Sequence, residues 1–306
     1  MNLRQLDYFV HVAEVGSFSR AASLLSIAQS ALSHKVRQLE IELKQPLLYR
    51  NGRGVTPTDA GKRLLEHARN ILLQVSRTRD ELEEVRGTPT GHVVVGLPQT
   101  VAMLLAVPLV AQFRAVFPKA SLGIREALSV SLVEWLSTGR ADIGLLFNPA
   151  PSPAIEIMPW LEEPMCLVAR REARGRGGAR HSIGLVELAR VPLILASRPN
   201  AHRMLIDAEL GKLGLRPTIA LEVDGVGSIL KLVAEGCGQT VLPRTSLRGF
   251  GLDRAFSVRP IVRPSIAIRL ALAVSAQRPI TPLVQGVLKL IREAGPALLS
   301  GRRGAR

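Results

Sequence analysis

The sequence predicts an α/β protein in which a helical N-terminal segment precedes a larger part made of alternating strands and helices. Residues 1–86 carry apolar side chains at helical spacing, whereas residues 91–306 contain short β-branched runs separated by helical stretches. Between them, residues 88–91 (Thr-Pro-Thr-Gly) form a cluster of turn-forming residues and the best candidate for a hinge. A chain of 306 residues is also longer than one ordinary core supports, so at least two domains are expected.

The composition excludes several classes of protein. With 47% hydrophobic and 21% charged residues, the chain is too apolar to be disordered. Its two cysteines, Cys166 and Cys237, lie 71 positions apart and make neither a disulfide framework nor a zinc box. The longest apolar run, residues 101–111, has 11 residues, about half of what a membrane span requires. A cytoplasmic protein without a metal site is therefore expected.

The net charge of +15 favours a polyanionic partner such as nucleic acid, but it does not locate a site. Residues 1–90 carry 13 basic and 10 acidic side chains, and residues 91–306 carry 27 and 15. Much of that second excess lies in two Gly/Arg-rich stretches, residues 170–180 and 301–306. The functional surface must therefore be found from patterns and not from bulk charge.

Three short helices are predicted in the first 45 residues. The first ends near Gly16, and Ser17 can cap a second helix over residues 19–25 that is rich in small apolar residues. A third helix is expected to open at Ser30, because a single apolar stripe follows it with helical spacing. That stripe consists of Leu32, Val36, Leu39 and Leu43.

The opposite face of this third helix carries short hydroxyl and basic side chains. Ser30, Ser33, His34 and Arg37 cluster there at 100° per residue. Short serines allow a helix axis to approach base edges, and His34 and Arg37 can reach bases or phosphates in a DNA major groove. An ordinary solvated face is the alternative, but the preceding small-residue helix and the short turn at 26–29 favour a helix-turn-helix.

A β-hairpin wing is predicted directly after this helix. In Arg50-Asn51-Gly52-Arg53-Gly54, two glycines permit a tight turn and two arginines project beside it, as a contact with phosphate or the minor groove requires. A plain surface turn is the alternative interpretation.

These residues resemble the LysR-type transcriptional regulators. The resemblance is carried by Ser17-Phe18-Ser19-Arg20-Ala21-Ala22, Gln29-Ser30-Ala31-Leu32-Ser33, Arg37-Gln38-Leu39-Glu40 and Thr58-Asp59-Ala60-Gly61. It implies that Gln29, Ser30, Ser33 and His34 read or contact DNA, with Arg50 and Arg53 in the wing. The family commonly has Pro at the position of Ser30 and Arg at that of His34, so the preferred half-site is expected to differ here.

A heptad pattern follows the wing, after Thr58 as a helix N-cap. We predict a dimer seam on this helix and a second stripe, Leu65 and Leu72, packed on the same chain. A core helix of one globular domain is the alternative. The seam comprises Leu64, Ala68, Ile71, Val75, Thr78, Leu82 and Val85.

No catalytic motif and no cofactor site is recognisable in residues 91–306, so a sensor domain is expected rather than an enzyme. Residues that follow predicted strands at helix starts suit a small organic anion. The expected effector-binding residues are Gln99, Thr100, Ser129, Phe147, Arg198, His202, Val226 and Gly227. The expected strands are 93–97, 122–125, 143–147, 193–196, 220–223, 240–242 and 266–274, mostly in a parallel sheet.

The resemblance implies the remaining organisation. The expected domains are a winged helix-turn-helix (1–58), a linker or dimerisation helix (59–87), a hinge (88–91) and an effector-binding domain (92–306). The last would form two Rossmann-like lobes similar to periplasmic binding proteins, one of about 92–163 with 265–295 and one of about 164–264.

Expected partners are double-stranded promoter DNA, a small-molecule effector and a second copy in a homodimer or a dimer of dimers. RNA polymerase is a further candidate. Two rival functions remain open at this point: an effector-independent DNA compactor, and a small-molecule-binding protein or enzyme with a helical dimerisation domain.

Overall fold

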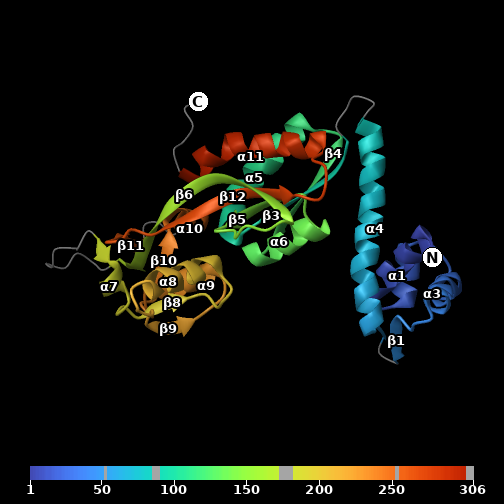
Figure 1. Cartoon of the computed structure of the whole chain (residues 1–306), viewed down its shortest axis with the longest axis horizontal. Helices are drawn as coiled ribbons and strands as arrows, with labels where there is room; N and C mark the ends of the chain where they lie inside the picture. Colours follow the sequence, from blue (N-terminus) through green and yellow to red (C-terminus); the bar gives the residue numbers. More distant parts are fainter. Residues whose placement is uncertain (52–53, 85–89, 172–181, 252–254, 301–306) are drawn as a thin grey trace. The chain divides into compact units, whose positions relative to one another are not determined.

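A computed structural model describes residues 1–51, 54–84, 90–171, 182–251 and 255–300. The chain forms two compact units, Met1–Gly87 and Thr88–Arg306, and Figure 1 labels most of their elements. We describe each unit separately.

The N-terminal unit begins with three helices whose ends follow from their capping residues. These are α1 (Leu3–Val15), α2 (Phe18–Leu24) and α3 (Gln29–Leu43). Gly16 ends α1 in the left-handed conformation, and the Ser17 hydroxyl accepts from the Arg20 amide, as predicted. Helix α3 begins at Gln29, one residue before the predicted start at Ser30. Its N-cap is Ala28, which has no side-chain acceptor and therefore gave no capping signal in the sequence.

The predicted wing is confirmed as an antiparallel hairpin of β1 (Leu48–Asn51) and β2 (Gly54–Pro57). The start of β2 is fixed to the C-cap residue of α1, because the Val55 amide donates to the Gly16 carbonyl at 2.9 Å. A side chain at Gly54 would place its Cβ 2.9 Å from the same carbonyl oxygen, and the φ of Gly54 is +142°. Only glycine permits this close approach.

The long helix α4 (Asp59–Glu84) completes the unit. The Thr58 hydroxyl accepts from the Gly61 amide at 2.9 Å, which confirms the predicted N-cap. Side chains of α4 then pack on the core formed by α1, α2 and α3, and the Glu14 and Arg69 side chains add an ion pair at 2.6 Å. Leu65 and Leu72 lie in this core, as predicted.

The larger unit contains an eight-stranded sheet with helices on its faces and a separate two-stranded parallel sheet of β8 and β9, which confirms the α/β class. The order of the main strands is β4-β3-β5-β12-β6-β11-β7, and β10 pairs with β6. The strands are β3 (Gly91–Leu97), β4 (Ala120–Glu126), β5 (Ile143–Phe147), β6 (Ile155–Arg170), β7 (Ile183–Gly184), β8 (Leu193–Leu195), β9 (Ile219–Glu222), β10 (Thr240–Pro243), β11 (Phe256–Val262) and β12 (Ala267–Ser275). The helices are α5 (Gln99–Val116), α6 (Ser129–Thr138), α7 (Leu185–Leu188), α8 (Ala201–Gly211), α9 (Val226–Ala234), α10 (Arg244–Gly249) and α11 (Pro282–Ser300).

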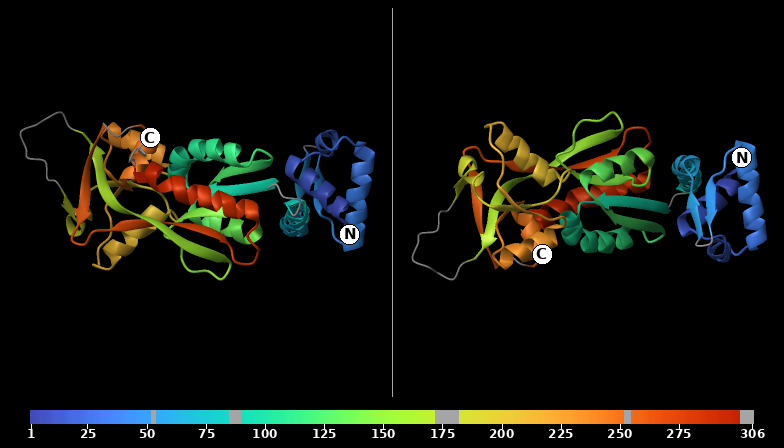
Figure 2. Two further views of the ribbon diagram at one scale, coloured as in Figure 1. Left: turned by 90° about the horizontal axis from the view of Figure 1, so that it is seen from above. Right: turned by 90° about the horizontal axis from the view of Figure 1, so that it is seen from below.

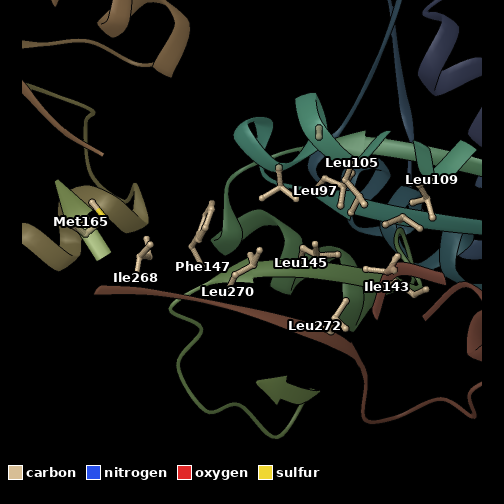
Figure 3. Packing of buried hydrophobic residues seen from close by; sticks show 14 of the residues in the cluster. Leu97, Leu105, Leu109, Ile143, Leu145, Phe147, Met165, Ile268, Leu270 and Leu272 are labelled. Carbon is tan, nitrogen blue, oxygen red and sulfur yellow. The ribbon is translucent and has the colours of Figure 1, made fainter. Parts of the chain in front are cut away.

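Strand β3 is buried on both faces because helices cover both sides of the sheet. Val93, Val95 and Leu97 pack with α5 and α11, whereas Val94 points to the opposite face and packs with α6. Leu105 and Leu109 of α5 point toward β5 in Figure 3.

Helix α5 is long and apolar enough to cross a membrane, with a mean hydropathy of 1.5 over 18 residues, and it alone passes that test among the described residues. Its Leu105, Leu109 and Phe113 are buried in the core of this unit. It is therefore a core helix that covers one face of the sheet.

Strand β6 runs through two parts of the unit. Its residues 155–164 pair with β12, and residues 165–170 pair with β10 and β11, all antiparallel. Figure 2 shows this long strand extending across both lobes. The prediction of a mostly parallel sheet is therefore wrong. Strand β3 pairs in parallel with β4 and β5, but β12 pairs antiparallel with both β5 and β6.

Candidate functional site: a helix-turn-helix face and a polar cleft

Helix α3 presents the predicted polar face to solvent. Gln29, Ser30, His34 and Arg37 are exposed, while the stripe on the other side, Leu32, Val36 and Leu39, is fully buried. This burial fixes the rotation of α3, so the four polar side chains can enter a groove together.

Arg50 is held by three contacts that connect the wing to this face. Its Nη1 donates to the Ser33 hydroxyl at 3.3 Å, its Nη2 lies 3.9 Å from a Glu40 oxygen, and its guanidinium covers the Phe18 ring at 4.7 Å. Arg50 therefore braces β1 against α2 and α3, a role that the sequence did not suggest. Arg53, the second arginine expected in the wing, lies outside the described residues.

The start of α3 is also fixed from the preceding helix. The Ser19 hydroxyl donates to the Gln29 side-chain carbonyl at 2.9 Å, across the turn of the helix-turn-helix. This contact orients the first candidate base-reading side chain, and sequence spacing gave no sign of it.

The seam predicted on α4 needs a correction at its N-terminal end. Ala68 is fully buried in the core of the same chain's N-terminal unit, so it is not free to meet a partner. Leu64 packs against the same core but is only half-buried, so its place in the seam stays a prediction. Ile71 is 38% exposed and Val75 is half-buried. The side chain of Leu82 and all of Val85 lie outside what the structure describes.

A cleft in the larger unit brings most of the predicted effector residues together. Its cavity has a volume of about 310 Å³. Gln99, Thr100, Ser129, Phe147, His202 and Val226 line it, with Pro98, Glu126, Ala127, Leu128, Ala196, Asn200, Ala201 and Gly225.

Four helices direct their N-termini at this cleft. The N-cap and first residues of α5, α6, α8 and α9 are all among the lining residues. Asn200 caps α8 by accepting from the His202 and Arg203 amides, but the caps of α5, α6 and α9 make no side-chain hydrogen bond. Three helix starts thus keep backbone N–H groups and the positive end of the helix dipole available for an anion.

His202 gives the cleft a neutral polar wall. Its residue is only 7% exposed, its ring lies 4.9 Å from that of Phe147, and burial lowers its pKa to about 4. Within the described chain, its buried Nε2 has no hydrogen-bond partner. At neutral pH the ring is therefore uncharged.

Ser129 supports the cleft wall, because its hydroxyl accepts from the Phe147 amide at 2.9 Å.

Two predicted residues do not line the cavity. The Arg198 guanidinium pairs with Asp207 at 2.8 Å, and Gly227 packs against the Phe250 ring. The sequence reasoning missed Glu126, the last residue of β4, which brings an exposed carboxylate to the rim.

Among the residues that the structure describes, no group of three or more His, Cys, Asp or Glu side chains could hold a metal ion. The arrangement offers two functional surfaces: a polar recognition face on α3 and an anion-compatible cleft.

Comparisons with known proteins match both units. Residues 3–62 match the bacterial regulatory helix-turn-helix protein, lysR family, and residues 86–296 match the LysR substrate binding domain. The nitrogen assimilation regulatory protein nac of Klebsiella aerogenes is 34% identical over 293 residues, which cover 95% of this chain and 94% of that protein.

Two solved structures give the same result. CbnR, a LysR family transcriptional regulator, has a TM-score of 0.70 at 25% identity over 96% of this chain and 99% of CbnR. A single-substitution variant of full-length OxyR from Pseudomonas aeruginosa has a TM-score of 0.71 at 25% identity over 96% and 94%. This chain belongs to the LysR family of DNA-binding transcriptional regulators, with an N-terminal helix-turn-helix and a C-terminal effector-binding domain.

Proposed function

We propose that this regulator acts in the cytoplasm, without enzymatic activity, and that a small organic anion in the cleft controls its promoter binding. The observation that carries the proposal is the convergence of four helix N-termini on one cavity, three of them without a side-chain cap. Backbone N–H groups at such starts favour carboxylates and similar anions.

The other cleft residues narrow the ligand class. Glu126 is the only Asp, Glu, Lys or Arg among the lining residues, and His202 is uncharged at neutral pH, so attraction for an anion comes from the helix starts. A carboxylate at the rim repels a second negative charge and accepts hydrogen bonds. We therefore expect a monoanion that also carries a hydroxyl or amine.

The proposed domains are residues 1–58, 59–87 and 92–306, joined by a hinge at 88–91, although Gly91 already belongs to β3. The lobe limits proposed are about 92–163 with 265–295 and about 164–264. The pairing of β6 with β12 on one side and with β10 and β11 on the other supports a crossing near residue 164.

For DNA, we propose that Gln29, Ser30, Ser33, His34 and Arg37 contact bases or phosphates. Four of these side chains are exposed on one face of α3, which supports this assignment. The fifth, Ser33, is half-buried and accepts a hydrogen bond from Arg50 of the wing. Arg50 would act mainly by holding the wing, and Arg53 would contact phosphate. Pairing through the exposed part of α4 would present two such faces to a two-fold operator.

A genomic footprint followed by binding assays tests the DNA part. The footprinted operator and a random duplex of equal length would be titrated over a range of salt concentrations. We expect a specificity ratio of at least about a thousandfold at physiological salt. A ratio near one would leave only the effector-independent DNA compactor.

Thermal-shift titration of the full chain with a panel of small hydroxy, amino and unsubstituted carboxylates tests the effector part. We expect the midpoint temperature to rise with a hydroxy or amino monocarboxylate and less with the matched dicarboxylate. Uncharged amides of the same acids are the control, and equal shifts by acids and amides would contradict an anion site.

A further inference from the structure

A second cavity in the larger unit lies between the paired strands β6 and β12 and the loop that follows β5. Its volume is about 450 Å³, and it shares no lining residue with the effector cleft. The chain segments that line it fall within residues 148–162 and 269–271, all of which the structure describes. The cavity is therefore a separate feature of the lobe that contains β3 and β5.

One face of the paired strands forms the floor of this cavity. Arg269 and Ala271 are two residues apart on β12, so they point to the same face of the sheet. Their partners on β6 are Glu162 and Pro159, which therefore lie on that face too. Leu270, between them, is buried in the core on the opposite face. The floor thus combines an apolar part, Pro159 and Ala271, with two charged side chains beside it.

The loop after β5 forms a fixed roof. The Asn148 amide donates to the Arg269 carbonyl at 2.8 Å, and the Asn148 side-chain oxygen accepts from the Arg269 amide at 2.8 Å. Pro149 and Pro151 follow and also line the cavity, and each proline ring fixes its own backbone φ. Because the walls are already in place, a ligand that enters loses little binding free energy to ordering them.

Glu162 and Arg269 carry opposite charges that do not neutralise each other directly. Residues in such a cross-strand pair have Cβ atoms about 5 Å apart, yet these two side chains form no ion pair. Both are exposed and line the cavity, and neither side chain has a hydrogen bond or ion pair with another described residue. They therefore present one negative and one positive group, side by side, to a molecule in the cavity.

We propose that this cavity binds a free α-amino acid with a large apolar side chain, as a second ligand site of the regulator. An α-amino acid carries its ammonium and its carboxylate on one carbon, so Glu162 can accept from the first while Arg269 donates a fork of hydrogen bonds to the second. Pro149, Pro151 and Pro159 supply apolar ring surfaces, and proline-rich segments pack well against aromatic rings. A ligand with a carboxylate alone would leave Glu162 without a partner.

The roof continues directly from a wall of the effector cleft. Phe147 precedes Asn148, its amide donates to the Ser129 hydroxyl at 2.9 Å, and its ring lies 4.9 Å from that of His202. A ligand held under the roof restrains the segment that carries Phe147. Ligands in the two cavities therefore influence each other's binding reciprocally, a consequence that rests on the function proposed for the cleft.

Calorimetric titration of the full-length chain with L-phenylalanine tests the site. Glu162→Gln and Arg269→Gln should each weaken binding about tenfold or more, because each removes a charge-assisted hydrogen bond. Both side chains are exposed, so the midpoint temperature should change little. Glu156→Gln, an exposed glutamate of β6 outside the cavity, and Arg216→Gln, an exposed arginine of the same unit, are matched controls that should bind within twofold of wild type.

Analogues of the ligand separate recognition of a zwitterion from recognition of one charge. Phenylpropionate lacks the ammonium and phenylalaninamide lacks the carboxylate, so each should bind wild type about tenfold more weakly than L-phenylalanine does. Equal affinity for all three compounds, or no saturable binding of L-phenylalanine, would overturn the proposal.

A variant of the effector cleft distinguishes the two cavities. Thr100→Val should bind L-phenylalanine as wild type does, since Thr100 lines only the cleft. Loss of binding in Thr100→Val, with Glu162→Gln and Arg269→Gln unaffected, would place the amino acid in the cleft and refute a second site. Failure of carboxylates to bind in the cleft would leave the expected losses in Glu162→Gln and Arg269→Gln unchanged.

Amide hydrogen exchange tests the connection through Phe147. L-phenylalanine should slow exchange in residues 143–148 and 201–205 of wild type but, at the same concentration, not of Arg269→Gln. Saturating L-phenylalanine without any change in these two segments would refute the coupling between the cavities.

Discussion

His202 should make the stability of the effector-binding domain fall steeply in mild acid. Burial alone lowers its pKa from 6.5 to about 4. Between these values the unfolded chain binds a proton that the folded chain does not, so the free energy of unfolding decreases as the pH falls through this window. Each pKa unit is worth about 1.4 kcal/mol, so His202 removes about 3 kcal/mol between pH 7 and pH 4.

Glu163 acts in the opposite direction and must be separated from this effect. Burial raises the pKa of its carboxyl above 4.5, so the folded chain takes up that proton first as the pH falls. Its contribution to stability therefore increases on acidification through the interval between 4.5 and its raised pKa and is lost as the pH rises through it. Comparing variants at the same pH isolates the histidine from the carboxyl.

Urea unfolding of the full chain, followed by tryptophan fluorescence, measures the required free energies. Both tryptophans, Trp135 and Trp160, lie in the larger unit, so the signal reports that unit. His202→Gln should lose less stability than wild type between pH 7 and pH 4, by about 3 kcal/mol, while Glu163→Gln should lose more. Parallel stability curves for wild type and His202→Gln would refute a histidine that is buried and neutral.

Three further predictions concern ligand, fold and DNA. Thr100→Val removes a hydroxyl from the cleft wall, so affinity for the effector anion should fall about tenfold to a hundredfold while ligand-free operator binding stays normal. A lower midpoint temperature with normal induction would instead show that Thr100 has only a structural role. Ala68→Glu buries a charge and should unfold the N-terminal unit, which circular dichroism would show. Ile71→Glu lies at an exposed position, so it should leave that unit folded and reduce dimerisation in analytical ultracentrifugation. Arg37→Ala should weaken all duplexes about equally if it contacts phosphate, while Ser33→Ala should change the preference among half-site variants in competition assays.

Local patterns were sufficient to predict much of the fold. The buried side chains of α3 recur with the helical period of 3.6 residues, and those of β3 form a continuous apolar run. Both patterns are visible in the sequence, so both elements could be predicted. Seven expected strands are present within one or two residues of their predicted limits. The wing was predictable because Gly52 and Gly54, two residues apart in the sequence, favour a tight turn between two short strands.

Strand β6 could not be recognised from the sequence for a physical reason. It contains Pro159 and Pro164 and three glutamates, a composition typical of loops. Its register with β12 shifts at Leu270/Ala271, where Trp160 is the extra residue, and this irregularity accommodates Pro159. Without β6, the antiparallel connection between the lobes could not be deduced.

The site was predicted in part, for a related reason. Helix starts after strands are local features, so the sequence could place Gln99, Ser129 and Val226 together, and all three line the cleft. The sequence does not show which arginine side chains already have a partner within the fold. Arg198 pairs with Asp207, and Arg50 contacts Phe18 and Glu40. Ala68 was assigned to a partner helix because a heptad pattern does not tell which chain supplies the contact.

The distribution of the cleft walls would determine how the proposed anion changes DNA binding. Helices α5 and α6 belong to the part of the sheet around β3 and β5, and α8 and α9 pack on the part around β8 and β10, so an anion at the four helix starts would contact both lobes. It would stabilise whichever arrangement brings the N–H groups of both sides within reach, and only its preference for that arrangement would shift the equilibrium. A tenfold shift needs about 1.4 kcal/mol, which one charge-assisted hydrogen bond from the far lobe supplies. An anion that contacts only one lobe should therefore bind without inducing.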